Sequence, residues 1–333
     1  MSESGVGPVA VVGAGSIGCG MAIVLARAGH AVRLCDVAAD PLAAAEARIA
    51  ASLADLAAFG LLDEAPEGVA GRLHATTDLV AALDGVVLVQ ECAPEELTTK
   101  RELLAALDRL APAAAVLASS SSAIPISAVA AGLAGRGRCL VAHPANPPFL
   151  LPVVELVPAS FTDPSTVDQA AVLFAAAGMA PVRLEREVEG FLFNRLQGAV
   201  LREAYCLVRD GVASVEAVDR VMRAGLGRRW AVIGPFETAD LNVLGGIAAH
   251  AARMGPAYAR LGAERGQDDP WTAQLVSRVA AERRALLPLE AWAERVAWRD
   301  RALMALEAAR RAQPDLFAEE DGGRPAPVLG QEG

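Results

Sequence analysis

Residues 8–18 read PVAVVGAGSIG, and this stretch decides the fold. The apolar run PVAVV predicts a buried strand, and Gly13, Gly15 and Gly18 follow it with the spacing GxGxxG. Such a turn between a strand and a helix lets the backbone approach a pyrophosphate, which then meets the positive end of the helix. Because glycine-rich turns are common, the context of the motif decides whether it binds a dinucleotide.

That context lies in the next 20 residues of the chain. Ser16–Ala28 predicts an alanine-rich helix, and HAVRLCD predicts a second strand that ends at Asp36, 18 residues after Gly18. An acid at this place accepts hydrogen bonds from ribose hydroxyls and repels a 2′-phosphate. The residues after it, VAAD, contain no arginine to bind that phosphate. We therefore predict NAD as the cofactor in preference to NADP, the alternative being a purely structural turn.

Composition excludes several classes of partner. The 333 residues carry 30 basic and 40 acidic side chains, and a net charge of −10 argues against nucleic acid and anionic membranes as partners. The uncharged run 5–26 has the length of a membrane span, but the glycines at 13, 15, 18 and 20 interrupt it, so we expect a strand, a turn and a helix. The five cysteines form no CxxC pair, which predicts free thiols, no bound metal and a cytoplasmic location.

Strands and helices alternate in the first half of the chain, which predicts a doubly wound, parallel α/β sheet of the Rossmann type. Further strands are expected at 85–90, 115–118, 139–142 and 153–157. After Gly190 the strand signals disappear, and helices are expected at 191–209, 214–222 and 291–311. We therefore expect an NAD-binding domain at 1–187, an all-α substrate and dimerisation domain at 188–312, and a disordered tail at 313–333.

Four polar residues suggest chemistry beside the cofactor: Ser122, His143, Glu155 and Asn194. A neutral imidazole is suited to take the proton of an alcohol whose hydride is being transferred. A glutamate can hold its tautomer, while a serine and an asparagine can bind the reacting oxygen. Taken singly, each has a structural alternative, such as a loop cap, a turn serine, a helix-end asparagine or a solvated strand-end acid.

Lys100 is the only lysine in the chain, since the other basic residues are all arginine. It follows QECAPE at the mouth of a predicted strand, where its compact ammonium could touch the cofactor. The alternative is that this one lysine is present by chance and has no role at the cofactor.

Together these stretches resemble the 3-hydroxyacyl-CoA dehydrogenase superfamily and, within it, the lambda-crystallin / L-gulonate 3-dehydrogenase branch. The matching segments are VVGAGSIG (11–18), QECAPEELTTK (90–100), LASSSSAIPIS (117–127), VAHPANPPFLLPVVELVP (141–158), EVEGFLFNRLQ (187–197) and GLGRRWAVIGPFETADLN (225–242). The superfamily commonly reads HPFNP or HFFNP at the histidine, whereas HPANPP here is similar to the gulonate branch.

The resemblance implies a role for each matching position. His143 is similar to the catalytic base and Glu155 to the carboxylate that pairs with it. Ser122 and Asn194 resemble ligands of the substrate oxygen. The implied cofactor contacts, beside the three glycines, are Ser16, Ile17, Asp36, Glu95 and Lys100.

The choice of substrate depends on two segments. An acyl-CoA enzyme of the superfamily is expected to place basic side chains after its second helix, but residues 55–71 contain four acids and no base. After a glycine turn, Arg229 matches an arginine of the gulonate branch and suits a small carboxylate, whereas Arg228 is expected at the surface. We therefore expect an NAD-dependent 3-dehydrogenase of a small hydroxy acid, with L-gulonate the best guess.

Three alternatives remain at this point. The first is a carnitine 3-dehydrogenase, in which Trp230 would face the ammonium. The second is a 3-hydroxyacyl-CoA dehydrogenase, and the third is a dinucleotide-binding structural protein of the crystallin kind. The resemblance also implies a homodimer formed by the helical domain.

Overall fold

The computed structural model describes residues 7–231, 234–242, 246–266, 274, 285 and 288–312, and the predicted tail at 313–333 lies outside them. The described residues form two compact units, one within the bounds Met1–Arg195 and Trp298–Ala309, the other within Leu196–Ala297 and Arg310–Gly333. The domain boundary predicted at residue 187 stays a prediction. The first unit extends to Arg195 and includes part of the last helix, because Met304 is 1% exposed in its core.

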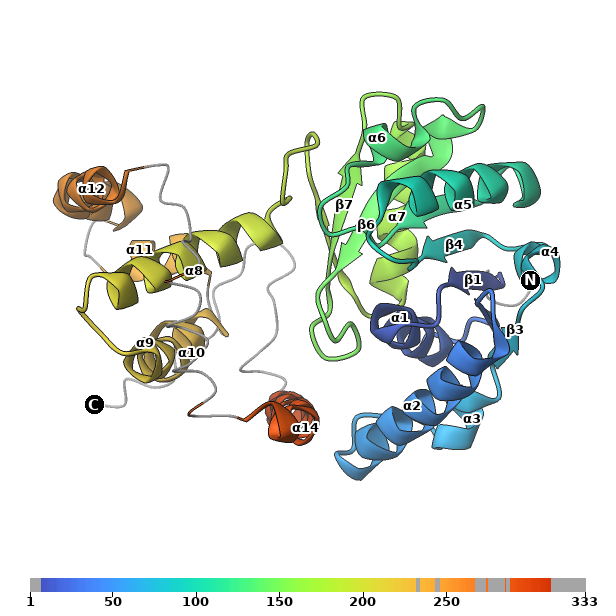
Figure 1. Cartoon of the computed structure of the whole chain (residues 1–333), viewed down its shortest axis with the longest axis horizontal. Helices are drawn as coiled ribbons and strands as arrows, with labels where there is room; N and C mark the ends of the chain where they lie inside the picture. Colours follow the sequence, from blue (N-terminus) through green and yellow to red (C-terminus); the bar gives the residue numbers. More distant parts are fainter. Residues whose placement is uncertain are drawn as a thin grey trace, which may run out of the picture. The chain divides into compact units, whose positions relative to one another are not determined.

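An eight-stranded sheet forms the centre of the first unit, in the order β3-β2-β1-β4-β5-β6-β7-β8 (Figure 1). All neighbouring strands are parallel except β6 and β7. Their bounds are β1 Val9–Val12, β2 Val32–Cys35, β3 Leu73–Thr76, β4 Leu88–Glu91, β5 Val116–Ser119, β6 Cys139–Pro144, β7 Val153–Pro158 and β8 Ala180–Arg183.

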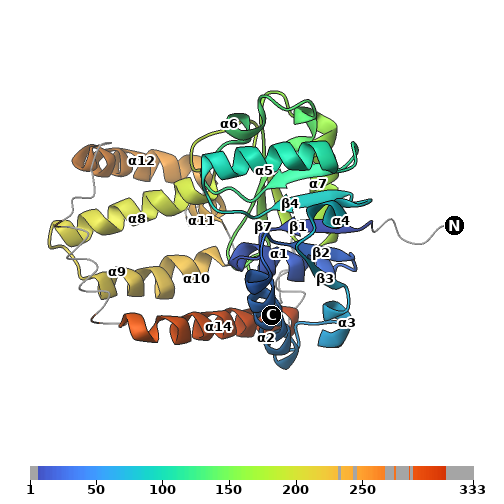
Figure 2. The same cartoon turned by 45° about the vertical axis from the view of Figure 1, so that its right-hand side comes forward.

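Helices cover both faces of this sheet, so the predicted doubly wound fold is confirmed. On one face, α1, α2, α3 and α7 contribute buried residues to a core that contains Val9 and Val11 of β1. On the other, α4, α5 and α6 pack with Ala10 and Val12 of the same strand (Figures 1 and 2). The bounds are α1 Ser16–Arg27, α2 Ala39–Ala58, α3 Pro66–Ala70, α4 Leu79–Leu83, α5 Leu97–Leu110, α6 Ile126–Ala130 and α7 Pro164–Ala176.

The sheet differs from the sequence prediction in two respects. Within the mainly parallel sheet, β6 and β7 pair antiparallel, because residues 145–152 are too few for the crossover of about a dozen residues that a parallel pair needs. The edge strands β3 and β8 were not predicted. Both are half-exposed and carry polar residues, so they lack the apolar run that marked the buried strands.

The second unit is helical in its described part, as expected from the loss of strand signals. It contains most of α8 (Phe193–Arg209), then α9 (Val215–Val221), a π-helical turn (Met222–Leu226), α10 (Gly227–Trp230), α11 (Pro235–Leu241), α12 (Gly246–Arg265) and the start of α14 (Trp292–Ala312). No helix among the described residues is both long and apolar enough to cross a bilayer.

The predicted start of α8 at Phe191 is wrong by two residues. Phe191 has a φ of 50°, which is outside the helical region, and the helix begins at Phe193. The reason is a carboxylate from a distant strand: Glu155 Oε1 accepts the backbone N–H groups of Leu192 (2.7 Å) and Phe193 (2.9 Å). It thereby caps the start of the helix.

Candidate active site

The glycine turn between β1 and α1 is shaped so that side chains are excluded at two of its three glycines. Gly13 has a φ of 111°, and a Cβ there would lie 2.5 Å from the carbonyl oxygen of Cys92. A Cβ on Gly18 would lie 1.8 Å from the carbonyl oxygen of Gly13. A Cβ on Gly15 would meet nothing within 4 Å, so open space lies next to the helix start.

That open space fits a pyrophosphate. Gly15 supplies no side-chain cap to α1, and Ser16 beside it is exposed. The first N–H groups of a helix have no partner within the helix and favour a bound anion. The predicted cofactor contacts at Gly13, Gly15, Ser16, Ile17 and Gly18 therefore lie on one turn.

Asp36 lies at the end of β2, half-buried and directly against the glycine turn. Its Oδ2 accepts a hydrogen bond from the backbone N–H of Ala14 at 2.8 Å. The carboxylate is thus fixed at the carboxyl edge of the sheet, where open α/β folds bind their ligands. Val37 after it is 97% exposed and has no charge to offer a phosphate.

His143 and Glu155 are directly opposite each other in the antiparallel ladder of β6 and β7. His143 Nδ1 and Glu155 Oε2 are 2.7 Å apart, and the two residues are 6% and 2% exposed. With Nδ1 donating to the carboxylate, Nε2 carries the lone pair that accepts a proton. Burial acts to raise the pKa of Glu155, but the hydrogen bonds from His143 and from the N–H groups of Phe193 and Leu192 outweigh it and lower the pKa.

Two phenylalanines enclose the imidazole. The ring of Phe191 lies 5.7 Å from that of His143 between centroids, and the ring of Phe193 lies 6.3 Å away and is nearly perpendicular. Phe191 is fully buried. The rings make the surroundings of the imidazole apolar, and a low local dielectric strengthens its pairing with Glu155. The sequence did not single them out, because FLF before a helix is indistinguishable from an ordinary core segment.

The structure also brings Ser122 and Asn194 together. Asn194 lies in the first turn of α8, and its side-chain Nδ2 donates to the backbone carbonyl of Ser122 at 2.9 Å. Glu155, which caps this helix, therefore helps to place Asn194 as well as His143. The four residues predicted to do the chemistry are linked by hydrogen bonds in two pairs, and Glu155 connects the histidine to the helix that carries the asparagine.

Glu95 and Lys100 lie at the same edge but differ in exposure. The side chain of Glu95 is 39% exposed, whereas that of Lys100 is 1% exposed and forms an ion pair with Glu91 at 2.9 Å. Sequence reasoning missed Glu91, although the acid that ends the buried strand LVQE was a signal for it. The implied contact between Lys100 and the cofactor stays a prediction, and the ammonium is already occupied by protein groups.

Arg229 lies on α10 in the second unit and is exposed. Trp230 beside it is 37% exposed. The side chain of Arg228 lies outside the described part of the structure.

A proton acceptor held at the same sheet edge as a dinucleotide turn is the arrangement by which dehydrogenases oxidise an alcohol group, and this chain is a dehydrogenase of that class. The 3-hydroxyacyl-CoA dehydrogenase NAD binding domain matches residues 8–188, and the C-terminal domain of the same enzymes matches residues 190–285. The chain therefore belongs to the 3-hydroxyacyl-CoA dehydrogenase family, and NAD is its cofactor, as the sequence predicted.

Individual relatives agree with this assignment. The chain is 40% identical to the lambda-crystallin homolog of Bos taurus over 316 residues, covering 94% of this chain and 98% of that protein. It is 41% identical to the L-carnitine dehydrogenase of Streptomyces griseus over 265 residues, covering 79% and 76%. A solved structure of 5-formyl-3-hydroxy-2-methylpyridine 4-carboxylic acid 5-dehydrogenase, an NAD+-dependent dismutase, superposes with a TM-score of 0.79 at 28% identity, covering 91% and 98%.

The placement of Asp36 generates a prediction about cofactor choice. Asp36→Ala should lower the ratio of kcat/KM for NAD to that for NADP by about tenfold to a hundredfold. The reason is that a charged acceptor of ribose hydroxyls is lost and the repulsion of a 2′-phosphate is removed. Steady-state kinetics with both cofactors measure this ratio. Val37→Ala, at the exposed next residue, should leave it within about twofold. Equal kcat/KM for the two cofactors in the unmodified protein would contradict the role of Asp36.

Proposed function

We propose that this protein oxidises the 3-hydroxyl of a small hydroxy acid with NAD, and that L-gulonate, converted to 3-dehydro-L-gulonate, is its substrate. The observation that carries the proposal is the buried His143–Glu155 pair, 2.7 Å apart, at the sheet edge where the glycine turn lies. A structural dinucleotide-binding protein would not need a buried histidine paired with a glutamate there.

In the proposed reaction His143 Nε2 takes the proton of the substrate hydroxyl. Bound NAD supplies the nicotinamide that accepts the hydride from the same carbon. The O–H and C–H bonds break, and a carbonyl forms. Glu155 stabilises the imidazolium that results, as an acid does in other base and orienting-acid pairs. Its lowered pKa keeps it ionised for this task.

Ser122 and Asn194 are proposed to hold the reacting oxygen. The hydroxyl of Ser122 is at an exposed position, and the carboxamide nitrogen of Asn194 has a second hydrogen beyond the one donated to the Ser122 carbonyl. Donors aimed at an oxygen stabilise the charge that develops as it becomes a carbonyl.

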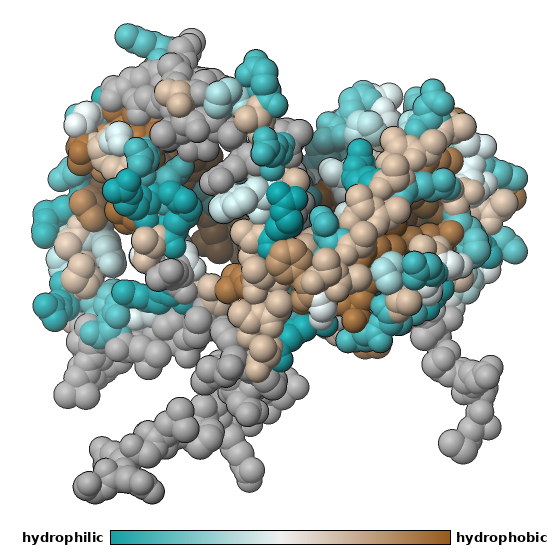
Figure 3. Space-filling view, turned by 90° about the horizontal axis from the view of Figure 1, so that it is seen from below, coloured by the Kyte–Doolittle hydropathy of each residue, from teal (hydrophilic) through white to brown (hydrophobic). Residues whose placement is uncertain are grey.

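The surface after the second helix supports a small substrate over an acyl-CoA. Asp63, Glu64 and Glu67 are exposed there, and Glu64 is paired with Arg72. Figure 3 looks from the side on which α2 lies, and weakly apolar side chains form a band over the first unit. The exposed acids at this place would repel the phosphates of a coenzyme A, which favours a substrate without them.

A carboxylate on the substrate is proposed to pair with Arg229. A guanidinium binds a carboxylate through two parallel hydrogen bonds, and Arg229 is exposed on a short helix. The related dismutase is named for a carboxylic acid, which is consistent with this class of substrate.

Carnitine is the second candidate, favoured by the 41% identity to an L-carnitine dehydrogenase and by the exposed Trp230, which could face a quaternary ammonium. Measuring NAD reduction with L-gulonate, L-carnitine and 3-hydroxybutyryl-CoA side by side separates the candidates. Failure of all three, with NAD still bound, would favour the structural alternative.

We also propose a cytoplasmic location, because all five cysteines are free thiols, which suits a reducing compartment.

Replacing the base tests the mechanism. His143→Ala should lower kcat by about 10²–10⁴ while NAD binding, measured by titration, is retained. Glu155→Gln should lower kcat by less and change the pH profile of kcat/KM, because the imidazole loses the carboxylate that orients it and stabilises its protonated form. His74→Ala, an exposed histidine on β3, is the matched control and should have no effect beyond about twofold. A His143→Ala enzyme within a few-fold of the wild type would exclude the histidine as the base.

Replacing Arg229 tests the substrate class. Arg229→Met should raise KM for the hydroxy acid by about tenfold to a hundredfold at unchanged NAD affinity, because a charge-assisted bidentate pair is lost. Arg229→Lys should restore only part of the lost substrate affinity, since an ammonium cannot form the two parallel hydrogen bonds of a guanidinium. The control is Arg220→Met on α9, an exposed arginine paired with Glu216 in the same unit. If the amide of the substrate serves the wild type as well as the acid, the small-acid proposal fails.

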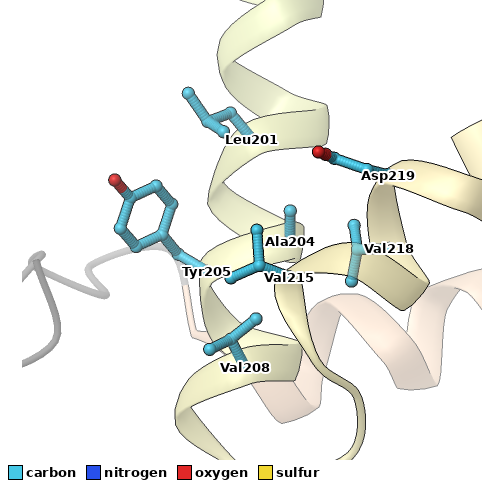
Figure 4. A pocket seen from close by; sticks show the side chains of 7 residues that line it. All are labelled: Leu201, Ala204, Tyr205, Val208, Val215, Val218 and Asp219. Atoms are coloured by element: carbon cyan, nitrogen blue, oxygen red, sulfur yellow. The ribbon is translucent and has the colours of Figure 1, made fainter. Parts of the chain in front are cut away.

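We further propose that the protein is a homodimer. On α8, Leu196 is 62% exposed and Leu201 is 41% exposed. An apolar groove of about 280 Å³ lies between α8 and α9, and Figure 4 shows its lining side chains: Leu201, Ala204, Tyr205, Val208, Val215, Val218 and Asp219. Exposed apolar faces of this kind mark interaction surfaces. Light scattering should give about twice the chain mass of 34.3 kDa, and Leu196→Glu should lower it. A single-chain mass at every concentration would contradict the dimer.

A further inference from the structure

Three charged side chains meet beneath the loop that carries Ser122. Lys100 Nζ donates to both oxygens of Glu91, at 2.9 and 3.0 Å, and to the carbonyl of Ala93 at 3.2 Å. It also forms an ion pair with Glu95 Oε2 at 3.5 Å. Lys100 and Glu91 are each 1% exposed. An ammonium has three hydrogens, so these partners satisfy it completely.

Glu91 ties this cluster to the ends of two strands. Besides the two bonds from Lys100, its carboxylate accepts the backbone N–H of Ala93 at 2.7 Å and the hydroxyl of Ser119 at 2.5 Å. Glu91 ends β4, Ser119 ends β5, and Lys100 lies in the first turn of α5. A buried ion pair is tolerated when hydrogen bonds satisfy its remaining positions, and this one joins three elements at the sheet edge.

Glu95 connects this cluster to residues 121–124, the turn that carries Ser122. Its Oε1 accepts the hydroxyl of Ser121 at 2.6 Å and the backbone N–H groups of Ser122 (3.0 Å), Ala123 (2.9 Å) and Ile124 (3.3 Å). Burial acts to raise its pKa, but the hydrogen bonds from Ser121 and Ala123 and the charge of Lys100 outweigh that effect and lower the pKa. An ionised Glu95 therefore holds the whole turn 121–124.

We propose that Lys100 and Glu91 are positioning residues, which fix Glu95 and, through it, the loop that presents Ser122 to the substrate. The proposal rests on the substrate role of Ser122 in the proposed function. Lys100 acts from below the loop, because its donors are used within the protein and its side chain is closed to solvent. This also gives a reason for the single lysine: a compact ammonium fits between two carboxylates and a carbonyl, whereas a planar guanidinium with five N–H groups would need more acceptors and more space.

A double-mutant cycle tests whether Lys100 acts through Ser122. Lys100→Met should lower kcat/KM for the hydroxy acid by about tenfold or more, and the same change in a Ser122→Ala background should cost less than about threefold. The dissociation constant of NAD, measured by titration, should change by less than about threefold. Effects that multiply, or a loss seen mainly in NAD binding, would overturn the proposal and make Lys100 a cofactor contact.

A second variant distinguishes a specific loss of activity from a general loss of folding. Lys100→Met alone leaves Glu91 buried without its partner, so the neutral pair Glu91→Gln/Lys100→Met is measured beside it. The matched control is Asp108→Asn/Arg138→Met, which removes a largely buried ion pair (2.9 Å) next to the amino end of β6, at the other edge of the sheet. We expect the first pair to lose activity as above and the control to keep it at comparable thermal stability. Equal losses in both would show a general structural effect and overturn the proposal.

Amide hydrogen exchange supplies a readout that needs no substrate. In the NAD-free protein, the N–H groups of Ser122, Ala123 and Ile124 are bonded to Glu95, so Glu91→Gln/Lys100→Met should speed their exchange by about tenfold, while the control pair should not. Unchanged exchange would overturn the proposal. If the wild type oxidises no hydroxy acid but exchange responds as expected, the proposed function fails and the positioning role stands.

Discussion

The two oxygens of Glu155 do different things, and the arrangement of the site depends on both. Oε2 pairs with Nδ1 of His143, while Oε1 accepts the first N–H groups of α8. The same carboxylate therefore orients the imidazole of His143 and caps the start of the helix that carries Asn194. Phe191, just before the capped N–H groups, has a left-handed backbone conformation, and its ring lies beside the imidazole. A shift of this carboxylate would therefore disturb the imidazole of His143, the start of α8 and the ring of Phe191 together.

The polar groups converge because six parallel strands, β1 to β6, have their carboxyl ends at the same side of the sheet. Parallel strands present their carboxyl ends together, so the glycine turn after β1, Asp36 after β2 and the loop after β5 share one side. The strand β7 runs antiparallel to β6, and its register sets Glu155 directly opposite His143. At this edge the molecule also buries Lys100 and Glu91, and the cost of burying charge is offset by the hydrogen bonds they exchange.

Local chemistry explains what could be predicted from the residues. Gly13 and Gly18 are required because any Cβ there would lie 2.5 or 1.8 Å from a backbone oxygen. Both glycines lie in a short segment whose strand and helix can be predicted from the hydrophobic pattern. The buried strands were recognisable because both of their faces are covered, which demands continuous apolar runs. The edge strands β3 and β8 were not, since half-exposed strands carry ordinary polar residues. Asp36 was found because its spacing from the turn is fixed by one helix and one strand.

The sequence by itself thus determined the doubly wound fold, the NAD cofactor and the family, all of which depend on short-range pattern and on the identity of individual residues. Only the tertiary structure decided how distant polar residues pair. It set Lys100 against Glu91, joined Glu95 to the turn 121–124 and made Glu155 a cap for α8. These contacts link segments up to 38 residues apart in the chain. No periodicity or spacing encodes them, because the partner of a buried charge is chosen by where the sheet and its covering helices bring the side chains.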